Sequence, residues 1–71
     1  MTPIFRYYCI MRPPGPGAIP KGAALTNAYE TRQYIPEIDR MAWGWVEYGR
    51  ELTPAEIADY ELIMHPRETE I

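Results

Sequence analysis

The sequence predicts an α+β fold: a small, mostly antiparallel sheet of three to four strands with one short C-terminal helix. Three observations support this prediction. Aromatic and β-branched side chains dominate residues 4–11, as they do in strands. Residues 42–49 alternate with the period of two that is typical of a strand. Residues 53–56 then carry the residue types that begin a helix.

The first strand is expected over residues 4–11, because a proline-rich segment follows and ends it. Successive side chains of a strand point to opposite faces of the sheet. We expect the core-facing set to be Phe5, Tyr7, Cys9 and Met11. The opposite face then carries Ile4, Arg6, Tyr8, Ile10 and Arg12.

Residues 12–22 are expected to form a loop, since seven of these eleven residues are proline or glycine. Proline fixes φ and lacks an N–H donor, and glycine permits turns, so a helix or an interior strand does not fit. The spacing of Pro13 and Pro16 is also that of a polyproline ligand, although Gly15 interrupts it. We favour a rigid connection between two strands, pre-shaped for binding at low entropic cost.

The middle of the chain is less sharply patterned. A strand is preferred over residues 23–30, with a short helix as the competing interpretation. Pro36 argues against a long helix in residues 31–41, which leaves a loop or one turn. The strand at residues 42–49 places Gly44 between two tryptophans, where a glycine lets another backbone or an aromatic ring approach closely.

A helix over residues 54–61 is the clearest local prediction. Thr53 is the N-cap, Pro54 occupies the first helical position, and Glu56 completes a capping box. Ile57 and Tyr60 would share one face, with Glu56 and Asp59 toward solvent. Residues 62–64 would return as a short edge strand, and residues 66–71 would form a frayed tail. Residues 1–71 would together make a single small domain.

Composition limits how such a small protein is stabilised. The chain has 71 residues, one cysteine and one histidine. An intrachain disulfide is therefore impossible, and a metal site of the usual Cys/His type is not expected. Homodimerisation is the remaining way to add buried surface to a chain of this length. With no apolar run of transmembrane length and no signal-peptide pattern, we expect a cytoplasmic protein with no membrane contact.

Catalytic chemistry is not indicated by the residue types present. Cys9 and His65 are the one nucleophile–base pair by type, and we interpret Cys9 as a buried core residue and His65 as an exposed imidazole. No phosphate-binding loop pattern occurs, and the prolines near Gly15 remove the backbone donors that such a loop needs. We predict a protein that is not an enzyme and carries no cofactor.

Two sets of residues are candidate binding sites. Residues 47–71 hold seven of the ten acidic side chains but two of the seven basic ones, which disfavours direct binding to a DNA backbone. This half offers an acidic surface to a basic partner through Glu47, Glu51, Glu56 and Asp59. Alternatively, cationic and aromatic side chains of the first half would bind a small anionic ligand: Arg6, Tyr8, Arg12, Lys21 and Trp45.

Three motifs together resemble short proteins of phages and conjugative elements labelled "defence against restriction, DarA-related". They are Tyr8-Cys9-Ile10-Met11-Arg12-Pro13-Pro14, Pro16-Gly17-Ala18-Ile19-Pro20-Lys21-Gly22, and Gly44-Trp45-Val46-Glu47-Tyr48 followed by Arg50-Glu51-Leu52-Thr53. The resemblance spans residues 7–62. It implies an accessory protein of a mobile element that counters host defence, with no catalytic residues to carry over.

Three functional hypotheses follow. The first is a non-enzymatic counter-defence protein that binds a host immune or restriction protein. The second is an oligomeric sponge for a small molecule such as a nucleotide signal. The third is a structural protein associated with the particle of the mobile element. The acidic half, the rigid loop and the family resemblance favour the first.

Overall fold

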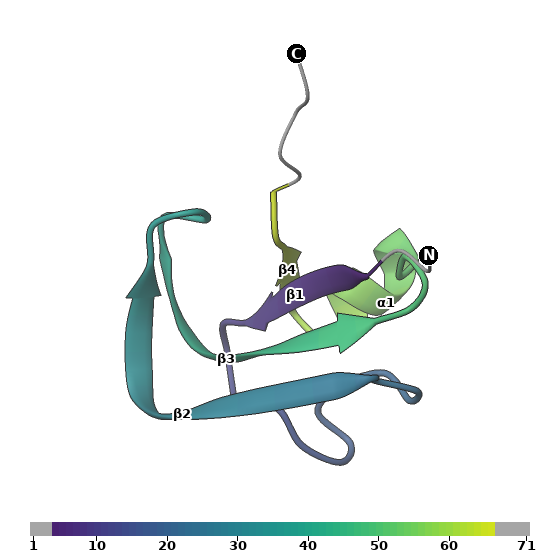
Figure 1. The fold of residues 1–71 in the computed structure, drawn as a ribbon, viewed down its shortest axis with the longest axis horizontal. Coiled ribbons are helices and arrows are strands. Elements are labelled where there is room, and N and C mark those ends of the chain that lie inside the picture. Colours follow the sequence, from purple (N-terminus) through teal and green to yellow (C-terminus); the bar gives the residue numbers. More distant parts are fainter. Residues whose placement is uncertain (1–3, 67–71) are drawn as a thin grey trace.

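The computed structural model describes residues 4–66 as one antiparallel sheet with a short helix (Figure 1). The strands are β1 (Phe5–Cys9), β2 (Leu25–Ile35), β3 (Arg40–Tyr48) and β4 (Leu62–Met64), and the helix α1 spans Pro54–Asp59. Their order in the sheet is β2-β3-β1-β4, and every neighbouring pair is antiparallel. The predicted α+β class, strand number and single short helix are confirmed.

The predicted strands at the start and end of the chain lie together in the sheet. β1 occupies a central position, with Tyr7 opposite Val46 of β3. On its other side β4 pairs with β1, and the backbone N–H of His65 donates to the carbonyl of Arg6 at 2.8 Å. The short edge strand predicted at residues 62–64 is confirmed. The predicted tail at residues 66–71 lies outside the described residues except for Pro66.

The main core lies on one face of the sheet. It is formed by Tyr7, Cys9, Val46, Tyr48, Leu52 and Leu62. Ile57 and Tyr60 of the α1 segment pack against it, as predicted from the helical spacing. The capping box is also confirmed, because the Thr53 and Glu56 side chains each accept the backbone N–H of the other residue, at 3.1 and 2.9 Å. The helix ends at Asp59, two residues before the predicted end.

The prediction that Met11 belongs to the core face is wrong. Met11 is 57% exposed, because β1 ends at Cys9 and the chain bends away before Met11. The alternation of a strand therefore does not extend to this position.

The Pro/Gly loop packs on the main core, as a rigid connection should. The N–H of Ala18 donates to the carbonyl of Gly15 at 2.9 Å. Between them, Pro16 precedes Gly17 with φ of +81°, the residue order of a type II turn. The hydroxyl of the buried Tyr48 donates to the carbonyl of Pro20 and so fixes the far end of the loop. The prediction of a non-helical loop at residues 12–22 is confirmed.

β2 departs from prediction in length and in shape. The strand preferred over residues 23–30 is confirmed, but it continues to Ile35 where a loop was expected. Pro36 starts the tight turn to β3, in which Asp39 has φ of +54°. Ala28 pairs with Gly44 and Gln33 pairs with Ala42, so residues 29–32 bulge away from β3. Figure 1 shows β2 turning a corner there.

Gly44 lies on the inside of this corner. A Cβ atom at Gly44 would collide with the carbonyl oxygen of Asn27 and lie 2.9 Å from Cδ of Pro14. The expectation that this glycine permits a close approach is confirmed, and the approaching group is the backbone of β2.

A second apolar cluster lies around Tyr8, which is on the side of β1 opposite Tyr7, and the sequence did not indicate this cluster. Tyr8, Ile35 and Ala42 are buried there, with Trp45 and Tyr29 partly buried beside them. Tyr8 was expected on an uncovered face, yet it is 4% exposed. The end of the β2–β3 hairpin turns away from the rest of the sheet at the corner (Figure 1), and Ile35 near this end is buried in one cluster with Tyr8.

Candidate functional site

The sheet has one covered face and one largely open face. Helix α1 and the Pro/Gly loop cover the face with the main core, because Ile57 and Ile19 both contact it. On the opposite face the strand registers bring together five side chains that no helix covers. We call them the open face: Arg6, Leu25, Trp45, Glu47 and Ile63. Arg6 lies opposite Glu47, which lies opposite Leu25.

The centre of the open face is an ordered cation–aromatic pair. The guanidinium carbon of Arg6 lies 4.0 Å from the ring centroid of Trp45. Nε and Nη2 of Arg6 donate to Oε2 of Glu47 at 2.9 and 2.6 Å. The Arg6 and Glu47 side chains are 35% and 17% exposed. Arg6 is therefore held in place by two partners, and its charge is balanced locally.

Leu25 adds an apolar element beside this pair. It is 56% exposed, although leucine is among the residues most often buried. Ile63, which lies opposite Tyr8 on β4, is half-buried on the same face. The open face therefore combines an ordered cation–aromatic pair with one exposed and one half-buried aliphatic side chain.

Next to the open face, Tyr8 contacts His65. The Tyr8 hydroxyl and Nδ1 of His65 are 2.9 Å apart, and the ring centroids are 5.7 Å apart. Cys9 points the other way, into the main core. Burial raises the pKa of its thiol to about 11, so it is protonated at neutral pH. Cys9 is buried as predicted, and the structure does not bring it together with His65.

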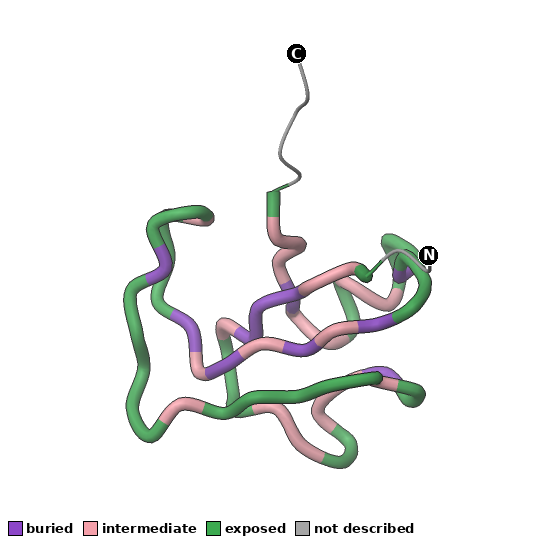
Figure 2. Tube along the Cα trace, viewed as in Figure 1, coloured by how far each residue is buried: buried purple, intermediate pink, exposed green. Residues whose placement is uncertain are grey.

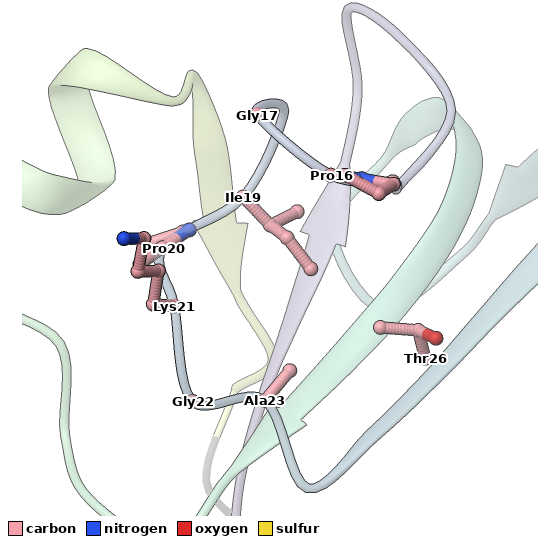
Figure 3. A pocket seen from close by; sticks show the side chains of 9 residues that line it. Pro16, Gly17, Ile19, Pro20, Lys21, Gly22, Ala23 and Thr26 are labelled. Atoms are coloured by element: carbon pink, nitrogen blue, oxygen red, sulfur yellow. The ribbon is translucent and has the colours of Figure 1, made fainter.

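The Pro/Gly loop encloses a shallow hollow of about 380 Å³ against the start of β2. Figure 3 shows Ile19 pointing toward this hollow, with Pro16 and Thr26 on its sides. The ammonium group of Lys21 is turned outward, away from Thr26 (Figure 3). The hollow is mainly apolar, so an apolar side chain fits it better than an anion does.

The family of the chain follows from a sequence comparison. Residues 2–67 match the model of the family described as "Defence against restriction A C-terminal". The chain belongs to this family. The match covers all three motifs on which the resemblance was based, and the resemblance is confirmed. No curated protein and no solved structure matches the chain.

In this member of the defence-against-restriction family, the four acidic residues singled out from the sequence lie in two places. Glu47 belongs to the open face. Glu56 lies on α1, where it accepts two hydrogen bonds of 2.9 Å from Arg50. These bonds, with the N–H of Thr53, lower the pKa of Glu56 to about 2. Glu51 and Asp59 are exposed, just before α1 and at its end.

The five residues proposed for a small anionic ligand are also divided. Arg6, Tyr8 and Trp45 lie side by side on one face, as their strand positions require. Arg12 instead pairs with Glu61 at 2.5 Å, and Lys21 lies at the hollow in the loop. The structure therefore keeps Arg6, Tyr8 and Trp45 of this candidate site together, while the cations Arg12 and Lys21 lie elsewhere.

The open face contains two residues that sequence reasoning missed, Leu25 and Ile63. Leu25 begins a strand whose two sides are both exposed, so no alternation marks its orientation. The neighbouring residues give no signal either, because Leu25 directly follows Ala23 and Ala24 and does not stand out as an isolated apolar residue.

Within residues 4–66, the helix α1 lacks the length and the apolar character needed to cross a bilayer. In the same residues, His, Cys, Asp and Glu side chains do not gather in groups that could hold a metal ion.

Proposed function

We propose that this chain is a non-enzymatic accessory protein of a phage or related mobile element. It acts in the host cytoplasm and counters restriction by binding a host defence protein. Membership in the defence-against-restriction family is the observation that supports this role. The surface chemistry supports binding as the mode of action.

The open face is the contact surface in this proposal. Tryptophan and arginine are the residue types that most often dominate binding energy at protein interfaces. Trp45 and Arg6 are stacked and ordered before binding, so little conformational entropy is lost when a partner covers them. Leu25 supplies apolar area that is exposed in the free protein.

The acidic side chains act at a longer range. Proteins that handle DNA present basic surfaces, and complementary charge raises the rate of encounter between two proteins. Glu51 and Asp59 are exposed and can contribute to such steering. Glu47 and Glu56 hold ion pairs within the protein, so they contribute charge but are poor positions for a test by mutation.

The open face is tested with Leu25→Lys and the matched control Met11→Lys. The two residues are 56% and 57% exposed, but Met11 lies outside the open face. Protection of phage DNA is measured by plating efficiency on hosts with and without a restriction system, after circular dichroism confirms folding. We expect Leu25→Lys to weaken capture of the host protein roughly tenfold and to reduce protection, while Met11→Lys behaves as the wild type. Equal protection by both variants would exclude the open face as the contact surface.

Electrostatic steering is tested separately with the double variant Glu51→Lys, Asp59→Lys. The association rate with the captured host protein should fall and lose much of its dependence on salt. The dissociation rate should change little, because the residues steer the encounter without being buried in it. An unchanged association rate at low salt would exclude the acidic contribution.

A small-molecule sponge is the second candidate, favoured by the adjacency of Arg6, Tyr8 and Trp45. Native mass spectrometry of the gently purified protein decides between the two. An anion of a few hundred daltons retained by the wild type and lost in Trp45→Leu would favour the sponge. A ligand-free protein that captures a host protein would favour the first proposal.

A further inference from the structure

β2 is an exposed edge of the sheet. It is the outermost strand next to β3, and its 11 residues contrast with the three residues of β4 at the other edge. Only Ile35 is buried and only Tyr29 is half-buried along its length. Figure 2 shows β2 as the most exposed strand of the structure. A long edge strand offers a row of backbone donors and acceptors to another strand.

The corner in β2 makes the centre of this edge project furthest. Four residues of β2 lie between the pairs Ala28–Gly44 and Gln33–Ala42, where β3 has one residue. The three surplus residues push the strand outward. Glu30, Thr31 and Arg32 are all exposed at this position. Proline, which would block pairing at an edge, is absent from β2.

The sequence of β2 is complementary to itself in the antiparallel direction. If two copies pair about Thr31, then Glu30 of each lies opposite Arg32 of the other, which makes two opposite-charge pairs. The same register places Tyr34, which is 54% exposed, opposite Ala28 of the second copy. Within residues 4–66, Glu30 forms no ion pair, so its charge is available to a partner.

We propose that two copies of this chain associate through antiparallel pairing of their β2 strands about Thr31. The two four-stranded sheets then become one continuous sheet across the interface. Dimerisation adds buried surface to a chain whose length limits the size of its core. The open faces of both copies remain available, so this inference does not depend on the proposed function.

The test uses Glu30→Arg, Arg32→Glu and the charge swap that combines both. Each single change puts like charges opposite each other twice in the dimer, while the swap restores two opposite-charge pairs. Sedimentation velocity over a range of concentrations should show a wild-type dimer. We expect each single variant to dissociate roughly tenfold more easily and the swap to recover wild-type behaviour.

A mixture of the two single variants makes the test specific for the register. Glu30→Arg and Arg32→Glu repel themselves but are complementary to each other, so their equimolar mixture should form a heterodimer that native mass spectrometry resolves. Far-UV circular dichroism confirms that each variant is folded.

Two outcomes would overturn the proposal. A wild-type protein that stays monomeric at every concentration would show that the corner blocks edge pairing, as bulges can. A dimer that is unaffected by the single charge changes would place the interface elsewhere. Protection against restriction is measured in the same variants, so that the dimer and the proposed function are tested separately. A protein that is monomeric but still protects would refute the dimer and leave the proposed function standing.

Discussion

The hydroxyl of Tyr7 accepts the backbone N–H of Leu52 at 2.8 Å, and both residues are buried. This bond ties the central strand β1 to the segment that enters α1. The Tyr7 ring also meets Tyr48 edge to face, with the ring centroids 6.2 Å apart. One tyrosine therefore links the sheet, the helix approach and the aromatic packing of the main core.

Removal of the Tyr7 hydroxyl should destabilise the protein. Tyr7→Phe leaves the Leu52 N–H buried without a partner, which costs about 1–2 kcal/mol of unfolding free energy. Urea denaturation followed by tryptophan fluorescence measures the loss. Tyr34→Phe is the control, because it also removes a hydrogen bond, that to Asp39, but at a residue that is 54% exposed. Water can replace an exposed bond, so this change should cost less than about 0.5 kcal/mol. A loss as large in the control would mean that the buried bond is not the cause.

Gly44 should be intolerant of any side chain. A Cβ atom there would meet the carbonyl of Asn27 and lie 3.0 Å from Cα of Ala28, both of which are backbone atoms that cannot rotate aside. We expect Gly44→Ala to cost about 3 kcal/mol, measured by thermal and urea unfolding. Gly15→Ala is the matched control, since nothing lies within 4 Å of its added methyl group. If the two variants were equally stable, the corner would not require glycine.

The ion pair and cap at Glu56 should make stability depend on acid pH. Arg50 and the N–H of Thr53 lower the pKa of Glu56 from 4.5 to about 2. The folded state stabilises the ionised carboxylate of Glu56. Its contribution to the unfolding free energy is therefore present above pH 4.5 and is lost as the pH falls toward 2. We expect the unfolding free energy of the wild type to decline across this window.

Glu56→Gln should flatten that decline, because glutamine retains a capping acceptor but no charge. Urea midpoints measured between pH 5 and pH 2 test this expectation. Asp59→Asn removes a charge from the same helix without removing an ion pair, and it should keep the wild-type slope. An unchanged slope in Glu56→Gln would assign the acid sensitivity to other carboxylates.

The local elements were predictable because each has a signal within a few residues. Thr53, Pro54 and Glu56 form a cap that requires no distant partner. Prolines and glycines at residues 12–22 exclude regular structure by their own geometry. The alternation around Val46 likewise predicted a strand, although the structure was needed to show that the side with Val46 is the buried one.

The course of β2 could not be predicted in the same way. Its side chains show no alternation, since both sides of the strand are exposed. A proline within such a segment indicates a loop, but Pro36 occupies the turn after β2, where its missing N–H has no cost. The corner at residues 29–32 depends on pairing with β3, which is a contact between segments.

For the candidate site, the sequence supplied the residue types and the tertiary structure supplied the neighbours. Arg6, Trp45 and Glu47 were each singled out, but in two competing sets. The register between β1 and β3 places all three on one face, so Glu47 neutralises the arginine instead of joining the acids near α1. The sequence does not reveal this ion pair, because Arg6 and Glu47 are far apart along the chain and become neighbours only when β1 pairs with β3.

The sequence by itself determined the strands β1 and β3, the capped helix and the loop between β1 and β2, since local backbone preferences decide these elements. It also carried the motifs that place the chain in its family. Only the tertiary structure decided which face is covered, where β2 turns its corner and which charges are paired. Those features arise from cross-strand register and from the burial of Tyr8, Ile35 and Ala42 against one another, and no short stretch of sequence contains that information.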